Sequence, residues 1–135
     1  MEIIPYREDI LKYVEKLKEK LGAKLIILYG SIAKGNFGVG SDIDILIVSD
    51  ALPENFLERL KVLFLLNESF APIEAIGYKS DEFRKMVVNA HPIALDALYE
   101  GIILHKDEKY EKEIRKIFRE VMKRVRKEDF GWIKL

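Results

Sequence analysis

The stretch Tyr29–Asp50, YGSIAKGNFGVGSDIDILIVSD, decides how this chain folds. Its glycines and serines lead to Asp42 and Asp44, and Ile43–Ser49 forms a mostly apolar run. Such a run predicts a strand that is covered on both faces. Flexible glycines and charged carboxylates at the mouth of a strand do not favour folding, so we interpret them as parts of a ligand-binding site.

Helices and strands alternate on both sides of this stretch. Apolar residues at helical spacing predict a helix from Pro5 that stops at Gly22, because proline suits the first turn and glycine the end. The pattern predicts further helices from Pro53 to about Asn67, from Ser80 (as the cap) to His91-Pro92, over Ile93–Tyr99 and from about Asp107 to Lys127. It predicts strands over Lys24–Tyr29, from about Ala71 to Tyr78 and over Ile102–Leu104.

This order predicts one α/β (α+β) domain over residues 1–135, with a small mixed sheet of about four strands flanked by helices. The helix that begins at about Asp107 carries an apolar stripe that runs on to Val125, and its other face is mostly basic. A basic face of this kind is usually solvated. The tail holds Phe130 and Trp132, which either dock on the domain or form an interface. His91 and His105 are expected to have structural roles.

Composition narrows the class of protein. The chain has 135 residues, of which 49% are hydrophobic and 34% charged, as in a globular domain. Because 23 basic residues balance 23 acidic ones, net charge does not indicate a nucleic-acid-binding protein. The chain has no cysteine, which excludes disulfides and cysteine-bound zinc. No signal pattern or membrane-length apolar run is present, so we expect a cytoplasmic protein without a membrane segment.

Asp42 and Asp44 form the first candidate site. Alternate side chains of a strand point to the same side, and their Cα atoms lie about 7 Å apart. Two carboxylates this close repel each other unless a cation lies between them. Magnesium is commonly held by one or two carboxylates together with substrate phosphates, so the pair suits a magnesium–nucleotide site. The alternative is that both aspartates cap a turn and stay solvated.

Glu74 is the candidate for a third carboxylate. It interrupts an apolar strand, where an unpaired buried charge costs free energy. If that strand pairs with Ile43–Ser49, Glu74 reaches the same side as Asp42 and Asp44. The alternative is a glutamate on an edge strand that faces water. Other nearby acids are better explained as turn and capping residues: Asp50, Asp81 and Glu82.

Gly30-Ser31 directly follows a predicted strand and suits a phosphate. Backbone N–H groups at such a break can bind an anion, and the lack of a Cβ lets phosphate approach. A turn that only requires glycine is the alternative. The stretch is not a P-loop, because Asn36-Phe37 stands where that motif requires Lys-Ser/Thr. It is not a dinucleotide-binding fingerprint either, because Ile43 occupies the place of the third glycine.

Together these residues read G-S-x-A-x-G-x5-S-D-x-D from Gly30 to Asp44. This pattern resembles the signature of the DNA polymerase β-like nucleotidyltransferase superfamily, and the short chain resembles its minimal members from bacteria and archaea. The resemblance implies that Asp42 and Asp44 hold two magnesium ions, with Glu74 as the third metal ligand. It also implies that Gly30, Ser31 and Ser41 contribute to the nucleotide site and that Lys34 meets phosphate.

The resemblance implies transfer of a nucleoside monophosphate, expected to be AMP, from a triphosphate such as ATP to an acceptor hydroxyl, with release of pyrophosphate. The resemblance to the minimal members also implies a protein partner, a HEPN-type toxin. The transferase would then be the antitoxin, which modifies this toxin. One alternative is a catalytically silent antitoxin that only binds its partner or forms a homodimer. Another is a transferase that acts on a small molecule, although little chain after Asp107 is left for an acceptor domain.

Overall fold

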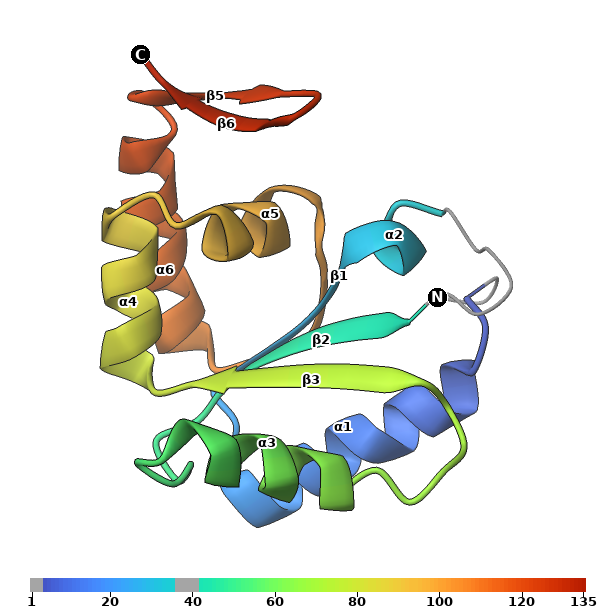
Figure 1. The fold of residues 1–135 in the computed structure, drawn as a ribbon. Coiled ribbons are helices and arrows are strands. Elements are labelled where there is room, and N and C mark those ends of the chain that lie inside the picture. Colours follow the sequence, from blue (N-terminus) through green and yellow to red (C-terminus); the bar gives the residue numbers. More distant parts are fainter. Residues whose placement is uncertain (1–3, 36–41) are drawn as a thin grey trace.

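The computed structural model describes residues 4–35 and 42–135 (Figure 1). The helices are α1 (Arg7–Leu21), α2 (Gly30–Ala33), α3 (Phe56–Leu65), α4 (Ser80–Val88), α5 (Pro92–Glu100) and α6 (Glu108–Val121). The strands are β1 (Leu25–Tyr29), β2 (Ile43–Val48), β3 (Ile73–Tyr78), β4 (Ile102–Lys106), β5 (Val125–Glu128) and β6 (Gly131–Lys134).

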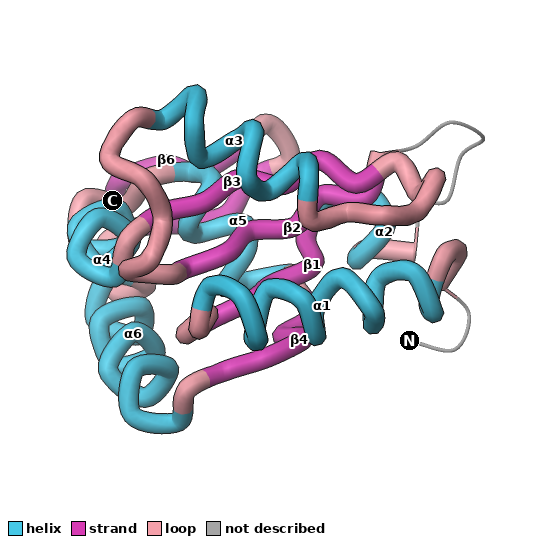
Figure 2. The backbone as a smooth tube through the Cα atoms, turned by 90° about the horizontal axis from the view of Figure 1, so that it is seen from below, coloured by secondary structure: helices cyan, strands magenta, loops and turns pink. Residues whose placement is uncertain are grey.

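The main sheet has four strands in the order β3-β2-β1-β4. Strand β1 is antiparallel to both β2 and β4, whereas β2 and β3 are parallel. Figure 2 shows α1 and α3 on one face of this sheet, and α4, α5 and α6 cover the other. The predicted mixed sheet of about four strands flanked by helices is therefore confirmed.

Strand β2 is buried because it supplies both apolar cores. Its odd-numbered residues, such as Ile45 and Ile47, pack in the core with α1, and Leu46 and Val48 pack in the core with α4, α5 and α6. This alternation explains the unbroken apolar run. It also assigns Asp44 to the face of Leu46 and Val48, because all three positions are even-numbered.

Several predicted helix boundaries were wrong. Helix α3 begins at Phe56 and not at Pro53, because the Asn55 side chain caps it by accepting a hydrogen bond from the Glu58 N–H.

Ser80 does not cap α4: Lys79 is the N-cap, and the side chain of Glu82 accepts a 2.7 Å hydrogen bond from the Lys79 N–H. The Ser80 hydroxyl instead donates to Asp50, which also accepts from the Ser80 N–H. Long-range pairing with Asp50 thus replaces the local cap.

The last helix is also shorter than predicted. Helix α6 ends at Val121, and Val125, which we placed on its stripe, begins β5. Strands β5 and β6 form a hairpin that docks on α5 through Trp132, whose Nε1–H donates to Asp96 Oδ1 at 2.9 Å. The Trp132 ring also meets Tyr99 edge-on, with ring centroids 5.3 Å apart. The tryptophan of the tail therefore docks on the domain.

Both histidines make structural contacts, as expected. His91 precedes α5, and its Nδ1 accepts a hydrogen bond from the Ile93 N–H. His105 Nε2 lies 2.9 Å from the Ala23 carbonyl oxygen. Across residues 4–35 and 42–135, no helix combines the length and apolar character needed to cross a membrane. That residues 1–135 form a single domain stays a prediction.

Candidate active site

The parallel pairing of β2 with β3 brings two of the predicted carboxylates side by side. Asp44 on β2 lies directly opposite Glu74 on β3, and on its other side Asp44 lies opposite Tyr29 of β1. Asp42 is exposed one residue before β2. Adjacent strands are about 4.8 Å apart, so the Asp44 and Glu74 carboxylates are close neighbours. Sequence reasoning made this arrangement conditional on the pairing, and the pairing is present.

The surroundings of Asp44 disfavour its charged form. Burial raises the pKa of Asp44 to about 6, and repulsion from Glu74 and then from Asp42 acts in the same direction. Burial and the neighbouring Asp44 also raise the pKa of Tyr29 to about 12, so this phenol stays protonated. The acidic group therefore holds unfavourable charge that a cation would relieve.

Gly30 allows the backbone to pass directly over Asp44. Its φ is +77°, in the left-handed region, and a Cβ at this position would lie 2.3 Å from Asp44 Oδ2. Both the backbone conformation and the close approach require glycine. A turn that merely needs glycine explains the φ, but it does not explain the contact with the carboxylate.

The other predicted phosphate residues lie on or beside α2. Ser31 is exposed in this short helix, which begins directly at the end of β1. Lys34 is its C-cap and forms a 2.8 Å ion pair with Glu100 of α5. Lys34 therefore has a protein partner where we expected phosphate, and a nucleotide would compete with Glu100 for it. Ser41 lies outside the described residues.

The acidic residues suit magnesium held jointly with a nucleotide better than a site made of protein alone. Within the described part of the chain, no three His, Asp or Glu side chains are grouped closely enough to enclose a metal ion. Magnesium does not need such a cage, because it is usually bound by one or two carboxylates, substrate phosphates and water. The repulsion among Asp42, Asp44 and Glu74 fits this role.

An apolar groove that sequence reasoning missed adjoins the carboxylates. It has a volume of about 480 Å³, and Asp44 and Glu74 line it together with side chains of α3. The α3 residues in the groove are Phe56, Leu60 and Phe64. The signal was present in the sequence of α3, FLERLKVLFL, which has more apolar positions than one core-facing stripe requires.

We predict that magnesium affinity depends on pH through Asp44. Below about pH 6 a proton occupies this carboxyl group, so a metal ion must displace it, and affinity should fall by up to about tenfold per pH unit. Above about pH 7 affinity should level off. Calorimetric titration of magnesium with a non-hydrolysable ATP analogue between pH 5 and 8 measures this. A pH-independent affinity would contradict it.

Three similarities to known proteins bear on the family of this chain. A protein of Methanocaldococcus jannaschii, named as a candidate protein adenylyltransferase, is 41% identical over 54 residues. The match covers 38% of this chain and only 37% of that relative. The crystal structure of a candidate nucleotidyltransferase from Sulfolobus solfataricus matches with a TM-score of 0.54 and 19% identity, covering 76% of this chain and 81% of the other.

A chain from the solved complex of a tri-AMPylated HEPN toxin with an MNT antitoxin, from Shewanella oneidensis, is also similar. Its sequence identity to this chain is 14% and the TM-score is 0.49, and the match covers 87% of this chain and 86% of that one. At 19% identity the Sulfolobus solfataricus structure supports the fold alone. The sequence family described as "Nucleotidyltransferase domain" matches residues 10–130, nearly the whole chain. This match shows that the chain belongs to the nucleotidyltransferase-domain family.

Proposed function

We propose that the protein is a metal-dependent nucleotidyltransferase that moves AMP from ATP to a hydroxyl group of an acceptor protein. The observation that carries this proposal is the position of Asp44, which lies opposite Glu74 and directly beneath the glycine backbone at Gly30. A carboxylate pair beside a backbone that phosphate can approach matches the needs of nucleotide transfer.

We assign each residue of the site a role in this reaction. Gly30 and Ser31 hold the triphosphate through backbone N–H groups and the serine hydroxyl. The acceptor oxygen attacks the α-phosphorus, the bond from that phosphorus to the β-phosphate oxygen breaks, and pyrophosphate leaves. The proton of the acceptor passes to Asp44 or Glu74. Most of the catalytic effect comes from positioning and charge, so few side chains are needed.

Asp42 and Asp44 would hold the metal together with the phosphates, and Glu74 would join them only in the nucleotide complex, since the three carboxylates do not form a metal cage by themselves. Magnesium, when bound, supplies positive charge that offsets the charge of the phosphates. We propose two magnesium ions because the chain resembles polymerase β-like enzymes. Burial is the main cause of the raised pKa of Asp44, and repulsion from Glu74 and Asp42 adds to it; this repulsion supports a cation here, because a positive charge would relieve it.

The proposed acceptor is a HEPN-type toxin, modified on a hydroxyl side chain. The resemblance to minimal nucleotidyltransferases supports this partner, and the Methanocaldococcus jannaschii relative is named as a candidate protein adenylyltransferase. A purified HEPN-type toxin, magnesium and α-labelled ATP test the proposal. We expect label on the toxin, none with the Asp44→Asn variant, and normal labelling with Asp81→Asn. Equal labelling by Asp44→Asn would refute the catalytic assignment.

A catalytically silent binding partner is the second candidate, since α3 exposes several apolar side chains of the kind that form interfaces. Magnesium-dependent ATP binding separates the two candidates. The transferase requires it, whereas a silent partner does not. A homodimer also stays a prediction, and sedimentation of the purified protein would measure it.

A further inference from the structure

Helix α3 exposes an apolar face that the fold does not use. Its buried side chains are Arg59 and Leu63, which face the domain. Phe56, Leu60 and Phe64 recur every four residues on a neighbouring face, where they are 44%, 37% and 74% exposed. Leu57 and Leu65 are also exposed, at 74% and 62%, but they do not line the groove. We call Phe56, Leu60 and Phe64 the α3 stripe.

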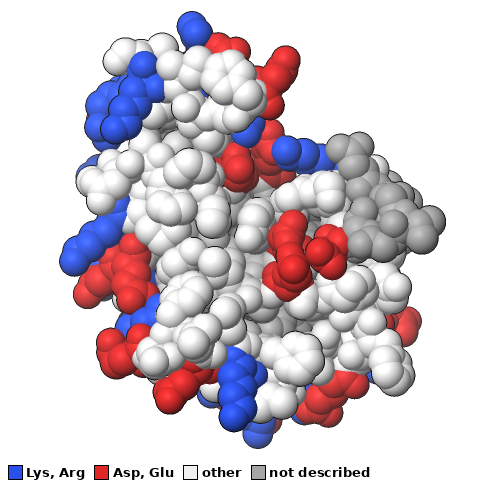
Figure 3. Space-filling model, in the orientation of Figure 1, with Lys and Arg blue, Asp and Glu red and all other residues white. Residues whose placement is uncertain are grey.

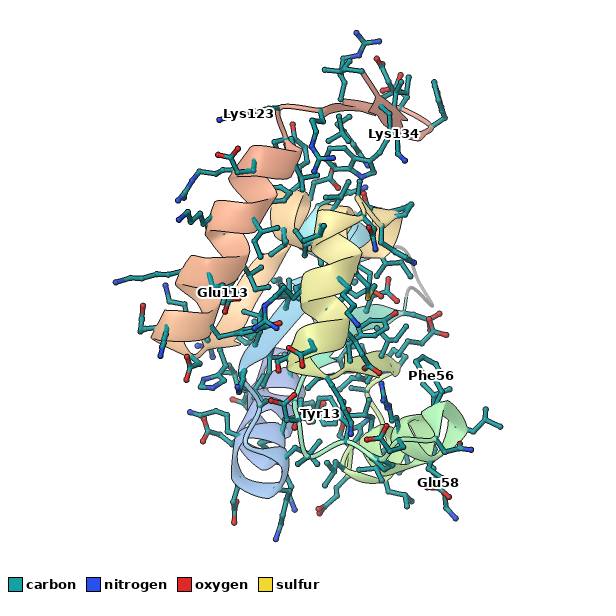
Figure 4. All side chains as sticks on the ribbon, turned by 90° about the vertical axis from the view of Figure 1, so that its left-hand side faces the viewer. Tyr13, Phe56, Glu58, Glu113, Lys123 and Lys134 are labelled. Atoms are coloured by element: carbon teal, nitrogen blue, oxygen red, sulfur yellow. The ribbon has the colours of Figure 1, made fainter. Side chains whose placement is uncertain are left out.

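The α3 stripe continues into the candidate active site. Phe56, Leu60 and Phe64 line the same groove as Asp44 and Glu74. In Figure 4, Phe56 lies on the side of α3 nearer the strands and Glu58 on the side away from them. The Phe56 ring also lies against Tyr78 of β3, with centroids 6.3 Å apart. A molecule on the stripe is therefore held next to the carboxylates.

The positions of the candidate site residues on neighbouring strands suggest the direction from which the acceptor approaches. Gly30 follows β1, Asp44 lies on β2, and Glu74 lies on β3, which is the edge strand of the sheet. Helix α3 packs on the opposite face of the sheet from Asp44, and its stripe meets the carboxylates in the groove beside β3. An in-line displacement needs the attacking and leaving oxygens on opposite sides of phosphorus. With the triphosphate at Gly30 and Ser31, the attacking hydroxyl comes from the side of β3 and the α3 stripe.

The chemistry of the groove selects a protein acceptor. Among the described residues that line it, the charged ones are Asp44 and Glu74, and both are acidic. Figure 3 shows acidic side chains together on this face, with uncharged surface directly below them and charged side chains of both signs further down. A nucleic-acid acceptor would need lysine or arginine for its phosphates. An apolar protein surface matches Phe56, Leu60 and Phe64.

We infer that the α3 stripe is the docking surface for the acceptor, and that the acceptor is a protein whose reactive hydroxyl is flanked by apolar side chains. The inference rests on the proposed function for its chemistry, but docking is measurable without catalysis. Its basis is one groove that contains both the stripe and the carboxylates.

Two synthetic peptides test the inference. Each carries one central tyrosine, flanked by leucines in one peptide and by asparagine and glutamine in the other. Fluorescence anisotropy should show that the leucine peptide binds the wild-type protein more tightly. Phe64→Ser should weaken this binding by about 10- to 50-fold, the range of an exposed aromatic anchor. Phe70→Ser is the matched control, because Phe70 is fully exposed but lies outside the groove.

The outcomes separate docking from transfer. Equal binding of both peptides, no binding of either, or unchanged binding by Phe64→Ser would overturn the docking surface. Magnesium-dependent ATP affinity should be the same in wild type and Phe64→Ser. If the leucine peptide binds through Phe64 but ATP does not bind, the docking surface stands and the proposed function fails.

Discussion

Replacing Asp44 with asparagine is expected to abolish nucleotide transfer while making the free protein more stable. Loss of this carboxylate would remove a proposed metal ligand, and we expect the rate to fall by about 10²- to 10³-fold, as when a single electrostatic contact to the transition state is lost. Label transfer from α-labelled ATP measures the activity. Thermal unfolding without magnesium measures the stability.

The gain in stability follows from the raised pKa of Asp44. The folded protein releases this proton near pH 6, whereas an aspartate in the unfolded chain does so near pH 3.9. The charge of Asp44 therefore lowers the free energy of unfolding above about pH 6, and this cost disappears below about pH 4. Because Asp44 is only half-buried, solvent screening limits the gain, and we expect the unfolding midpoint to rise by about 2–4 °C at pH 7.5.

Asp81→Asn is the control, since Asp81 is exposed on α4 and pairs with Arg84 away from the carboxylates. It should keep its activity and should not gain stability. Magnesium with ATP should stabilise the wild type and Asp81→Asn but not Asp44→Asn. A stable, fully active Asp44→Asn protein would remove Asp44 from the catalytic site.

The second large effect is expected for Gly30→Ala. A Cβ at this position would lie 2.3 Å from Asp44 Oδ2, and the backbone has a φ of +77°. The left-handed conformation costs about 1–2 kcal/mol for a residue with a Cβ, and relieving the clash costs about 1–3 kcal/mol more. Because the clash displaces Asp44, transfer activity should fall together with the free energy of unfolding. Chemical denaturation and label transfer measure the two effects.

Gly22→Ala separates these contributions. Gly22 ends α1 with a φ of +53°, but a Cβ there would meet nothing within 4 Å. In this variant the free energy of unfolding should fall only by the cost of a left-handed backbone at a residue with a Cβ. Its transfer activity should be unchanged. If Gly22→Ala and Gly30→Ala lose the same stability and Gly30→Ala stays active, the close approach of Gly30 to Asp44 has no functional role.

Local patterns in the sequence predicted most of the elements but few of their contacts. The helix that stops at Gly22 was confirmed, and the strand predicted over Ile43–Ser49 is present as Ile43–Val48, because helical spacing and apolar runs are properties of neighbouring residues. The hairpin β5–β6 was missed because its strands are short and Trp132 gains its contacts from α5. Ser80 was misplaced for the same reason, since its hydroxyl is bound by Asp50, thirty positions away.

The sequence by itself determined the chemistry available at Gly30, Asp42 and Asp44, since spacing along one loop and strand sets which groups come together locally. Only the tertiary structure decided that Glu74 is the neighbour of Asp44 and that Lys34 pairs with Glu100. It also decided that an apolar face of α3 borders the carboxylates. Strand register and helix packing depend on residues far apart in the chain, and the periodicity of one segment contains no information about its partner.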